Sequence, residues 1–327
     1  EIFLRKYRPE VVCDPFCGSG TVLVEAKALG IDAVGCDISA FNCLLTRVKT
    51  DAYDIRKLRG EIGDILVRFN YAARRDADHL LTICESDYLR KWFHPRALTQ
   101  LLCFRSLIGD YEYQDLLRVI LSRAARSARL TTHFDLDFPK KPVAQPYHCH
   151  KHGRVCQPTK DASQFLNRYA IDALKRVAEF SRIARPARTT VLHADARSAD
   201  FPFVDLVVTS PPYVGLIDYH EQHRYAYELL NLPQNPAAEI GPAFRGTSKS
   251  AQRRYVKEIG EVLCNLSARL SPGGRFVIIV SDKHGLYEGL AEKRGFEIET
   301  RLTRHVNRRT GRRANDFFEE VLIWRRA

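Results

Sequence analysis

Two short stretches of the sequence carry residue types that could do chemistry, and each follows an apolar run. The first is DPFCGSGT at residues 14–21, and the second is SPPY at residues 210–213. Proline fixes φ and removes a backbone donor, so neither a helix nor an inner strand continues through the second stretch. The two prolines instead predict a rigid turn, in which the Ser210 hydroxyl and the Pro211 carbonyl are hydrogen-bond acceptors beside the ring of Tyr213.

The glycine-rich stretch predicts a sharp turn that comes close to a ligand. Gly18 and Gly20 permit both the turn and the close approach, because they lack a Cβ atom. The spacing matches neither the dinucleotide-binding pattern G-x-G-x-x-G nor the P-loop, which argues against both kinds of phosphate site. Asp14, Pro15 and Phe16 add a carboxylate and an aromatic ring, which suit a ligand with a cationic amino acid end and a planar base. An ordinary strand-to-helix turn is the alternative interpretation.

Parallel strands are needed to position these turns. The stretch VVCDPFCGSGTVLVEAKALGIDAVGCDIS predicts a strand, a turn, an amphipathic helix that ends at Gly30, and a second strand that ends at Asp37. This is a βαβ unit, and it predicts a parallel sheet with a right-handed crossover. An acid in the position of Asp37 is placed to accept hydrogen bonds from ribose hydroxyls, with a helix N-cap as the alternative interpretation.

The rest of the chain divides into two parts with different sequence patterns. Residues 41–188 show mainly helical patterns with arginines on the polar faces, whereas an alternation of strands and helices resumes from residue 189. There we expect strands over TTVLHADARS, FVDLVV, GRFVIIV, EIETRLTRHV and FFEEVLIWRR, and helices over YVKEIGEVLCNLSARL and GLYEGLAEKRGF. The pattern predicts an α/β fold in which residues 1–40 and 189–327 form one domain and residues 41–188 are a large, mainly helical insertion.

Together, the stretches at 14–21 and 210–213 and the acid at Asp37 resemble the signatures of the DNA amino-methyltransferases. These enzymes use S-adenosylmethionine to methylate the exocyclic amine of cytosine or adenine. The resemblance covers residues 1–40 and 189–327 and makes them the catalytic domain. It implies a Rossmann-like mixed sheet, mostly parallel with an antiparallel last strand, and it implies that residues 41–188 are a candidate target-recognition region.

The resemblance also assigns site residues. The implied cofactor-binding residues are Asp14, Pro15, Phe16, Gly18, Gly20, Thr21, Asp37 and Asp195, the last of which matches the acid near the adenine of S-adenosylmethionine. The implied catalytic residues are Ser210, Pro211, Pro212 and Tyr213. The amine of a nucleobase is a poor nucleophile because its lone pair is delocalised into the ring. Acceptors on its two N–H groups draw the nitrogen towards sp³, and Tyr213 offers a stacking face to a base flipped out of the duplex.

The first residue of the SPPY motif bears on the choice of base. Ser-Pro-Pro-Tyr is typical of the family members that act on N4 of cytosine, and Asp-Pro-Pro-Tyr is typical of those that act on N6 of adenine. Ser210 therefore favours sequence-specific methylation of cytosine N4 in DNA. The alternatives are adenine-N6 methylation of DNA, then methylation of an RNA base, then a catalytically silent DNA-binding protein.

The net charge of +12 is consistent with a polyanionic partner, here DNA. The candidate nucleic-acid contacts are Arg123, Arg126 and Arg129 in the helical insertion and Arg308 and Arg309 in the loop before the last strand. No apolar run is long enough to cross a membrane and no leader pattern is visible, so we expect a cytoplasmic protein without a membrane partner. A companion restriction endonuclease is a candidate second partner, and the sequence leaves the oligomeric state open.

The stretch HCHKHGRVC contains potential metal ligands. Cys149, His152 and Cys156 could bind zinc with His148 or His150 as the fourth ligand. Structural zinc sites usually pair two knuckles that are well separated in sequence, whereas these residues form one compact cluster. We therefore expect no metal and interpret the stretch as a polar, DNA-facing loop.

Overall fold

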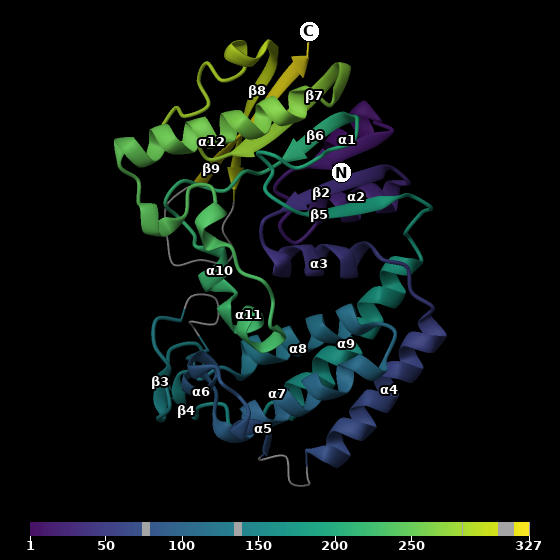
Figure 1. Cartoon of the computed structure of the whole chain (residues 1–327), viewed down its shortest axis with the longest axis vertical. Coiled ribbons are helices and arrows are strands. Elements are labelled where there is room, and N and C mark those ends of the chain that lie inside the picture. The colour runs from purple at the N-terminus through teal and green to yellow at the C-terminus, as the bar shows by residue number, and fades with distance from the viewer. Residues whose placement is uncertain (74–78, 134–138, 283, 307–316, 327) are drawn as a thin grey trace. The chain divides into compact units, whose positions relative to one another are not determined.

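The computed structural model describes residues 1–73, 79–133, 139–282, 284–306 and 317–326, and within these ranges the chain forms two compact units. The sheet unit comprises Glu1–Asp51, Ala184–Tyr219 and Asn235–Ala327, and the helical unit comprises Ala52–Ile183 and His220–Gln234. We describe each unit by itself (Figure 1).

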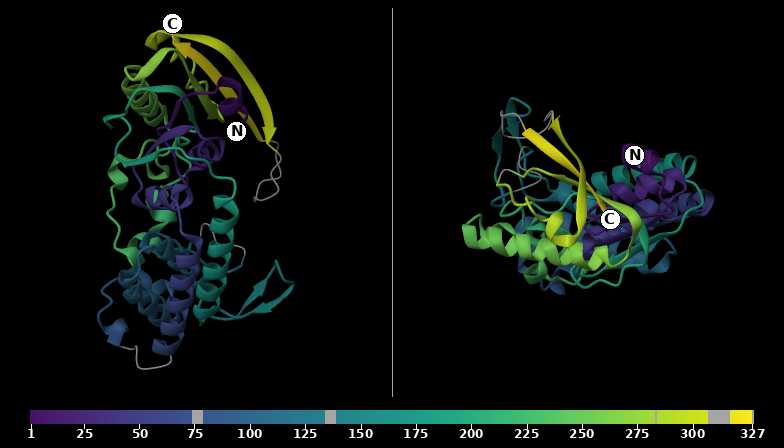
Figure 2. Two further views of the ribbon diagram at one scale, coloured as in Figure 1. Left: turned by 90° about the vertical axis from the view of Figure 1, so that its right-hand side faces the viewer. Right: turned by 90° about the horizontal axis from the view of Figure 1, so that it is seen from above.

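The sheet unit contains a seven-stranded sheet in the order β5-β2-β1-β6-β7-β9-β8. Its strands are β1 (Val11–Asp14), β2 (Asp32–Asp37), β5 (Thr189–His193), β6 (Val204–Thr209), β7 (Leu270–Val280), β8 (Phe296–Val306) and β9 (Phe317–Arg326). The five strands from β5 to β7 pair in parallel, whereas β9 runs antiparallel to both of its neighbours. Figure 2 shows β8 and β9, in yellow, as a long pair. The predicted mixed sheet with an antiparallel last strand is confirmed.

Helices cover both faces of the inner part of this sheet, which explains why β1 and β6 are apolar on both sides. The helices of the unit are α1 (Ile2–Tyr7), α2 (Thr21–Leu29), α3 (Ala40–Thr50) and α12 (Lys249–Ser267), with short 3-10 turns at η2 (Pro236–Ala238), η3 (Ala243–Arg245) and η4 (Glu292–Arg294). Along β7, Phe276 belongs to the core cluster that contains Ile259 of α12. The next residue, Val277, belongs to the opposite cluster with Leu23 of α2, as the two-residue period of a strand requires.

The helical unit accounts for most of the insertion predicted between the second and third parallel strands. Its elements are α4 (Ile55–Ala72), α5 (His79–Thr82), α6 (Asp87–Trp92), α7 (Pro95–Leu107), η1 (Ile108–Asp110), α8 (Gln114–Ala128), a hairpin of β3 (Tyr147–Cys149) and β4 (Arg154–Cys156), α9 (Ser163–Ser181) and α11 (Arg224–Leu230). Two boundaries differ from the predicted ones. α3 belongs to the sheet unit because it packs on β5 and α2, and α11 belongs to the helical unit because it packs on α8 and α6.

Two local expectations are wrong in detail. The helix expected over GLYEGLAEKRGF is a series of turns with only η4 in it, because Gly285 and Gly289 take positive φ values of 63° and 69° that interrupt a right-handed helix. The loop expected around HCHKHGRVC is the β3–β4 hairpin. α10 (Tyr219–Gln222) starts at the boundary between the two units. Within the described ranges, none of the helices has the length and apolar character needed to cross a bilayer.

Candidate functional site

The glycine-rich turn after β1 is shaped by close packing against α3. Gly20 has φ of 83°, and a Cβ atom at this position would lie 2.7 Å from Thr46 Oγ1. The Thr46 hydroxyl donates a hydrogen bond of 3.0 Å to the carbonyl of Gly18, which itself has φ of 50°. Both glycines are therefore required by the geometry of the turn, and their predicted place between a strand and a helix agrees with the structure.

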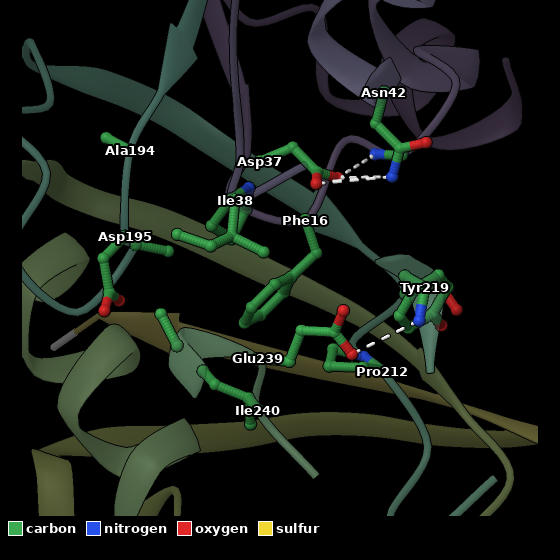
Figure 3. Close-up of a pocket in the computed structure, with 15 residues that line it drawn as sticks. Phe16, Asp37, Ile38, Asn42, Ala194, Asp195, Pro212, Tyr219, Glu239 and Ile240 are labelled. Atoms are coloured by element: carbon green, nitrogen blue, oxygen red, sulfur yellow. Dashed lines mark hydrogen bonds between the residues drawn. The ribbon is translucent and has the colours of Figure 1, made fainter. Parts of the chain in front are cut away.

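Asp37, at the end of β2, ties this turn to the start of α3. Its carboxylate accepts hydrogen bonds from the backbone N–H of Gly18 at 2.9 Å and of Ser39 at 2.8 Å. The side-chain amide of Asn42 lies 3.3 Å from both carboxylate oxygens, as the dashed lines in Figure 3 show. Ser39 is the N-cap of α3, since its hydroxyl accepts from the Asn42 backbone. The N-cap interpretation of Asp37 is therefore not what the structure shows.

Asp14, at the end of β1, is 4% exposed and links two strand ends. The Thr209 hydroxyl at the end of β6 donates to its Oδ1 at 2.7 Å, and the backbone N–H of Phe16 donates to the same oxygen at 3.1 Å. Burial raises the pKa of Asp14 to about 7, with the charge of Asp37 acting in the same direction and both hydrogen bonds opposing it. This acid thus holds the carboxyl ends of β1 and β6 together, and its contact with a cofactor stays a prediction.

Asp195 follows β5 and is held by an arginine two residues later. The Nε atom of Arg197 lies 2.9 and 3.0 Å from the two carboxylate oxygens of Asp195. Burial acts to raise the pKa of Asp195, but hydrogen bonds from the Arg197 side chain and backbone outweigh it, so that the pKa is lowered. Arg197 also contacts Glu258 of α12 and the carbonyl of Ala238. Asp195 is therefore a fixed anion at the pH of the cell.

These turns enclose a pocket at the carboxyl ends of the parallel strands, the usual ligand position in an open α/β sheet. Its lining residues are Pro15, Phe16, Gly18, Asp37, Ile38, Asn42, Ala194, Asp195, Ala196, Ser210, Pro212, Tyr219, Ala238, Glu239 and Ile240. Its volume, counted with the open space at its mouth, is about 760 Å³, within the range of small-molecule sites. Asp14, Gly20, Thr21, Pro211 and Tyr213 lie outside this described lining.

The pocket combines anionic ends with an apolar middle. In Figure 3, Phe16 and Ile38 lie between Asp37 and Asp195, and Ile240 lies across from them. Two carboxylates that accept hydrogen bonds, separated by apolar side chains, match an adenosyl group, whose ribose hydroxyls and adenine amine are donors on either side of an apolar ring. The described acceptors and apolar side chains therefore fit S-adenosylmethionine.

The SPPY turn after β6 is fixed by a buried pair of tyrosines. The Tyr255 hydroxyl of α12 donates to the carbonyl of Pro212 at 2.8 Å and lies 2.7 Å from the hydroxyl of Tyr287. Burial raises the pKa of both phenols, so both stay protonated at neutral pH. The hydroxyl of Tyr213 donates to Glu319 Oε1 of β9 at 3.3 Å. The turn is thus held from two sides.

Sequence reasoning missed several residues around the pocket. Glu239 is buried, and its Oε2 accepts the backbone N–H of Tyr219 at 3.2 Å. Burial raises the pKa of Tyr219 to about 12, with the charge of Asp37 as the next contribution. A signal for Glu239 was present, because an acid between Ala238 and Ile240 stands in an apolar setting. Tyr255 gave no such signal, since it lies on the apolar face of an amphipathic helix.

The predicted phosphate contacts in the helical unit have other partners. Arg129 is 3% exposed and its guanidinium lies 4.5 Å from the ring centre of Tyr225, so the expectation of a phosphate contact is wrong for this residue. Arg123 is half-buried and pairs with Asp172 at 2.8 Å. Arg126 is half-buried, and its contact with a phosphate stays a prediction. Arg308 and Arg309 lie outside the described residues.

Three of the potential metal ligands named from the sequence do come together. Cys149, His152 and Cys156 form one group, and its fourth member is His133. His148 and His150, named as alternatives for the fourth position, are exposed and lie with their rings 5.4 Å apart. The compact stretch alone could not show His133, which precedes it.

Comparisons with known proteins show which proteins this chain is similar to. A family of DNA methylases that act on N6 or N4 matches residues 7–47. The type II methyltransferase M.MjaII of Methanocaldococcus jannaschii is 33% identical over 98% of this chain and 76% of its own length. The type II methyltransferase M.MvaI of Kocuria varians is 25% identical over 38% of this chain and 29% of its own length. A crystal structure of an S-adenosylmethionine-dependent methyltransferase from Methanosarcina mazei is 12% identical, with a TM-score of 0.36, and covers 100% of this chain and 97% of its own.

Proposed function

This chain belongs to the S-adenosylmethionine-dependent DNA amino-methyltransferases, and from that membership we propose that it methylates N4 of cytosine in DNA. The observation that carries the choice of base is Ser210 at the first position of the SPPY turn, at the edge of the pocket. Family members that act on adenine typically have aspartate there. Adenine N6 on the same scaffold is the competing outcome of the test below.

The pocket residues would hold the cofactor as follows. Asp37 would accept from the ribose hydroxyls and Asp195 from the adenine amine, with Phe16, Ile38 and Ile240 against the ring. When bound, S-adenosylmethionine supplies an electrophilic methyl group on a sulfonium. Asp195 is suited to its role because Arg197 keeps it ionised and in place.

The residues of the SPPY turn would act on the target amine. The Ser210 hydroxyl and the Pro211 carbonyl would accept hydrogen bonds from the two N–H groups of this amine, which would localise the lone pair on the nitrogen. The neighbouring Pro212 carbonyl is already used by Tyr255, and this bond fixes the turn from which the acceptors project. Catalysis then rests on position and on oriented acceptors. Tyr213 would stack on the flipped base.

The helical unit is proposed as the target-recognition region. It contains most of residues 41–188 and adds His220–Gln234, which follows directly on the pocket residue Tyr219. Because the relatives are named type II methyltransferases, we further propose a companion restriction endonuclease with the same recognition sequence.

The test is an analysis of modified nucleosides. Plasmid DNA is incubated with the full chain and S-adenosylmethionine, digested to nucleosides and analysed by mass spectrometry, with the Ser210→Ala variant as the control for contaminating methylases. We expect N4-methylcytosine with the unchanged protein and a strong loss with the variant. N6-methyladenine as the sole product would refute the choice of base and leave the amino-methyltransferase assignment intact.

A further inference from the structure

Four side chains of types that commonly bind metal ions lie close together in the helical unit. His133, Cys149, His152 and Cys156 each offer one ligand atom, and these atoms all lie within 4.8 Å of one another. Cys149 and Cys156 end the two strands of the β3–β4 hairpin, and His152 lies in the turn between these strands. His133 comes from a separate part of the chain. The group is remote in sequence from the SPPY turn.

Three of the separations within the group match those of a tetrahedral site. The Cys149 sulfur lies 3.6 Å from the Nδ1 atoms of both His133 and His152. The Cys156 sulfur lies 3.4 Å from His152 Nδ1. Zinc binds thiolate at about 2.3 Å and imidazole at about 2.0–2.1 Å, so tetrahedral angles place sulfur and nitrogen about 3.6 Å apart. These three sulfur–nitrogen pairs already have the spacing that a zinc ion would impose, and all four ligand atoms lie within 4.8 Å of one another.

The β3–β4 hairpin needs a stabilising interaction beyond its own strand pairing. Each of its strands has three residues, and a two-stranded hairpin of this length is not stable alone. Within the two strands, the buried side chains are the two cysteines, 2% and 7% exposed, while His148, Arg154 and Val155 are exposed. Figure 2 (left) shows the hairpin as a projection from the helices of its unit. Two thiols do not make a hydrophobic core, so the burial of apolar side chains does not account for the stability of the hairpin.

We propose that His133, Cys149, His152 and Cys156 bind one zinc ion as a closed structural site. The soft thiolate and imidazole donors match zinc, and four protein ligands leave no open position for catalysis. Tyr147 supports the fourth ligand, since its hydroxyl accepts the backbone N–H of His133 at 3.2 Å. Binding fixes the hairpin to the segment at His133, and with it the exposed side chains that the hairpin carries.

The test is the metal content of the full chain purified from zinc-supplemented medium. We expect one zinc per chain by elemental analysis, and its loss in Cys149→Ser and Cys156→Ser. His150→Ala is the matched control, because it removes an imidazole from the same turn without touching the group, and it should keep its zinc. Replacement by cobalt(II) should give the visible absorption of a tetrahedral thiolate site in the unchanged protein and in the control only.

Folding is checked separately in each variant. A Cys149→Ser protein that lacks zinc, binds S-adenosylmethionine and keeps the helical circular dichroism of the unchanged protein has kept both units folded, so its loss of metal reports on the site. A chain without zinc that also fails to take up zinc(II) in a titration under reducing conditions would overturn the proposal. So would a Cys149–Cys156 disulfide identified by peptide mapping of the protein as purified, or equal loss of zinc in the His150→Ala control.

Discussion

The hydroxyl of Tyr255 should matter to catalysis as well as to stability, and a comparison with Tyr287 separates the two effects. Tyr255→Phe removes one oxygen and leaves two groups without their partner, the half-buried Pro212 carbonyl at 2.8 Å and the buried Tyr287 hydroxyl at 2.7 Å. A buried polar group that loses its partner costs about 1–3 kcal/mol. We expect the free energy of unfolding to fall by about that amount.

The expected effect on kcat follows from the position of the hydrogen bond between Tyr255 and the Pro212 carbonyl. The Pro212 carbonyl lies inside the SPPY turn, so its release lets the proposed acceptors Ser210 and Pro211 shift. Misplacement of reacting groups by about 1 Å can lower a rate by about 10²-fold. We expect kcat of Tyr255→Phe to fall by about 10- to 100-fold, with the affinity for S-adenosylmethionine changed by less than about threefold, since Asp37 and Asp195 are untouched.

Tyr287→Phe is the matched control. It removes a hydroxyl from the same buried pair, yet the Pro212 carbonyl keeps its donor, so kcat should stay within about threefold of the unchanged protein. Single-turnover methylation of duplex DNA gives the rates, thermal shift with S-adenosylmethionine gives cofactor binding, and urea unfolding gives the stabilities. Equal loss of kcat in the two variants would show that tyrosine positioning of the turn is not the cause.

Three further predictions concern single residues. Gly20→Ala should lower stability by about 1–3 kcal/mol and weaken cofactor binding, because the new Cβ would lie 2.7 Å from Thr46, whereas Gly63→Ala on the open face of α4 should stabilise by about 0.5–1 kcal/mol; calorimetry compares the two. The pKa of Asp14 is raised from 3.8 to about 7, so its stabilising contribution is full below its unfolded pKa and is lost as pH rises through about 7. Relative to Asp14→Asn, the free energy of unfolding should therefore fall by up to about 4 kcal/mol between about pH 4 and pH 8, and parallel curves would contradict the raised pKa. Arg129→Ala should lower the midpoint of thermal unfolding yet leave the salt dependence of DNA affinity unchanged, because this buried side chain contacts no phosphate.

The parallel sheet was predictable because its strands are apolar on both faces and end in turns that glycine and proline mark. The turns at 14–21 and 210–213 were predictable because the conformation of a turn depends mainly on the glycine and proline residues within it. The burial of Arg129 was not predictable, because this residue follows the last helical residue of α8 and has an extended ψ of 147°. The helical period that places Arg123 and Arg126 does not extend to it, and its partner Tyr225 is far away in sequence.

The residues that sequence reasoning missed share one physical cause. Tyr255, Glu239 and His133 act through partners brought to them by tertiary packing. A tyrosine on an apolar helix face has the pattern of an ordinary core residue, whether or not its hydroxyl reaches a catalytic turn. The hairpin strands are too short to show a two-residue period, so the sequence around them predicts only a loop.

The way the chain passes between its two units bears on how it folds. It crosses between them at residues 51–52, 183–184, 219–220 and 234–235, and β5 pairs with β2 only after the first long excursion. The contact between Cys36 and the Ala194 carbonyl closes a loop of 158 residues. The sheet unit thus has a high contact order, and we expect it to fold more slowly than the locally connected helices. During synthesis, β1 and β2 emerge before β5 and β6, so this pair presents two open strand edges, and we expect these edges to need protection by a chaperone.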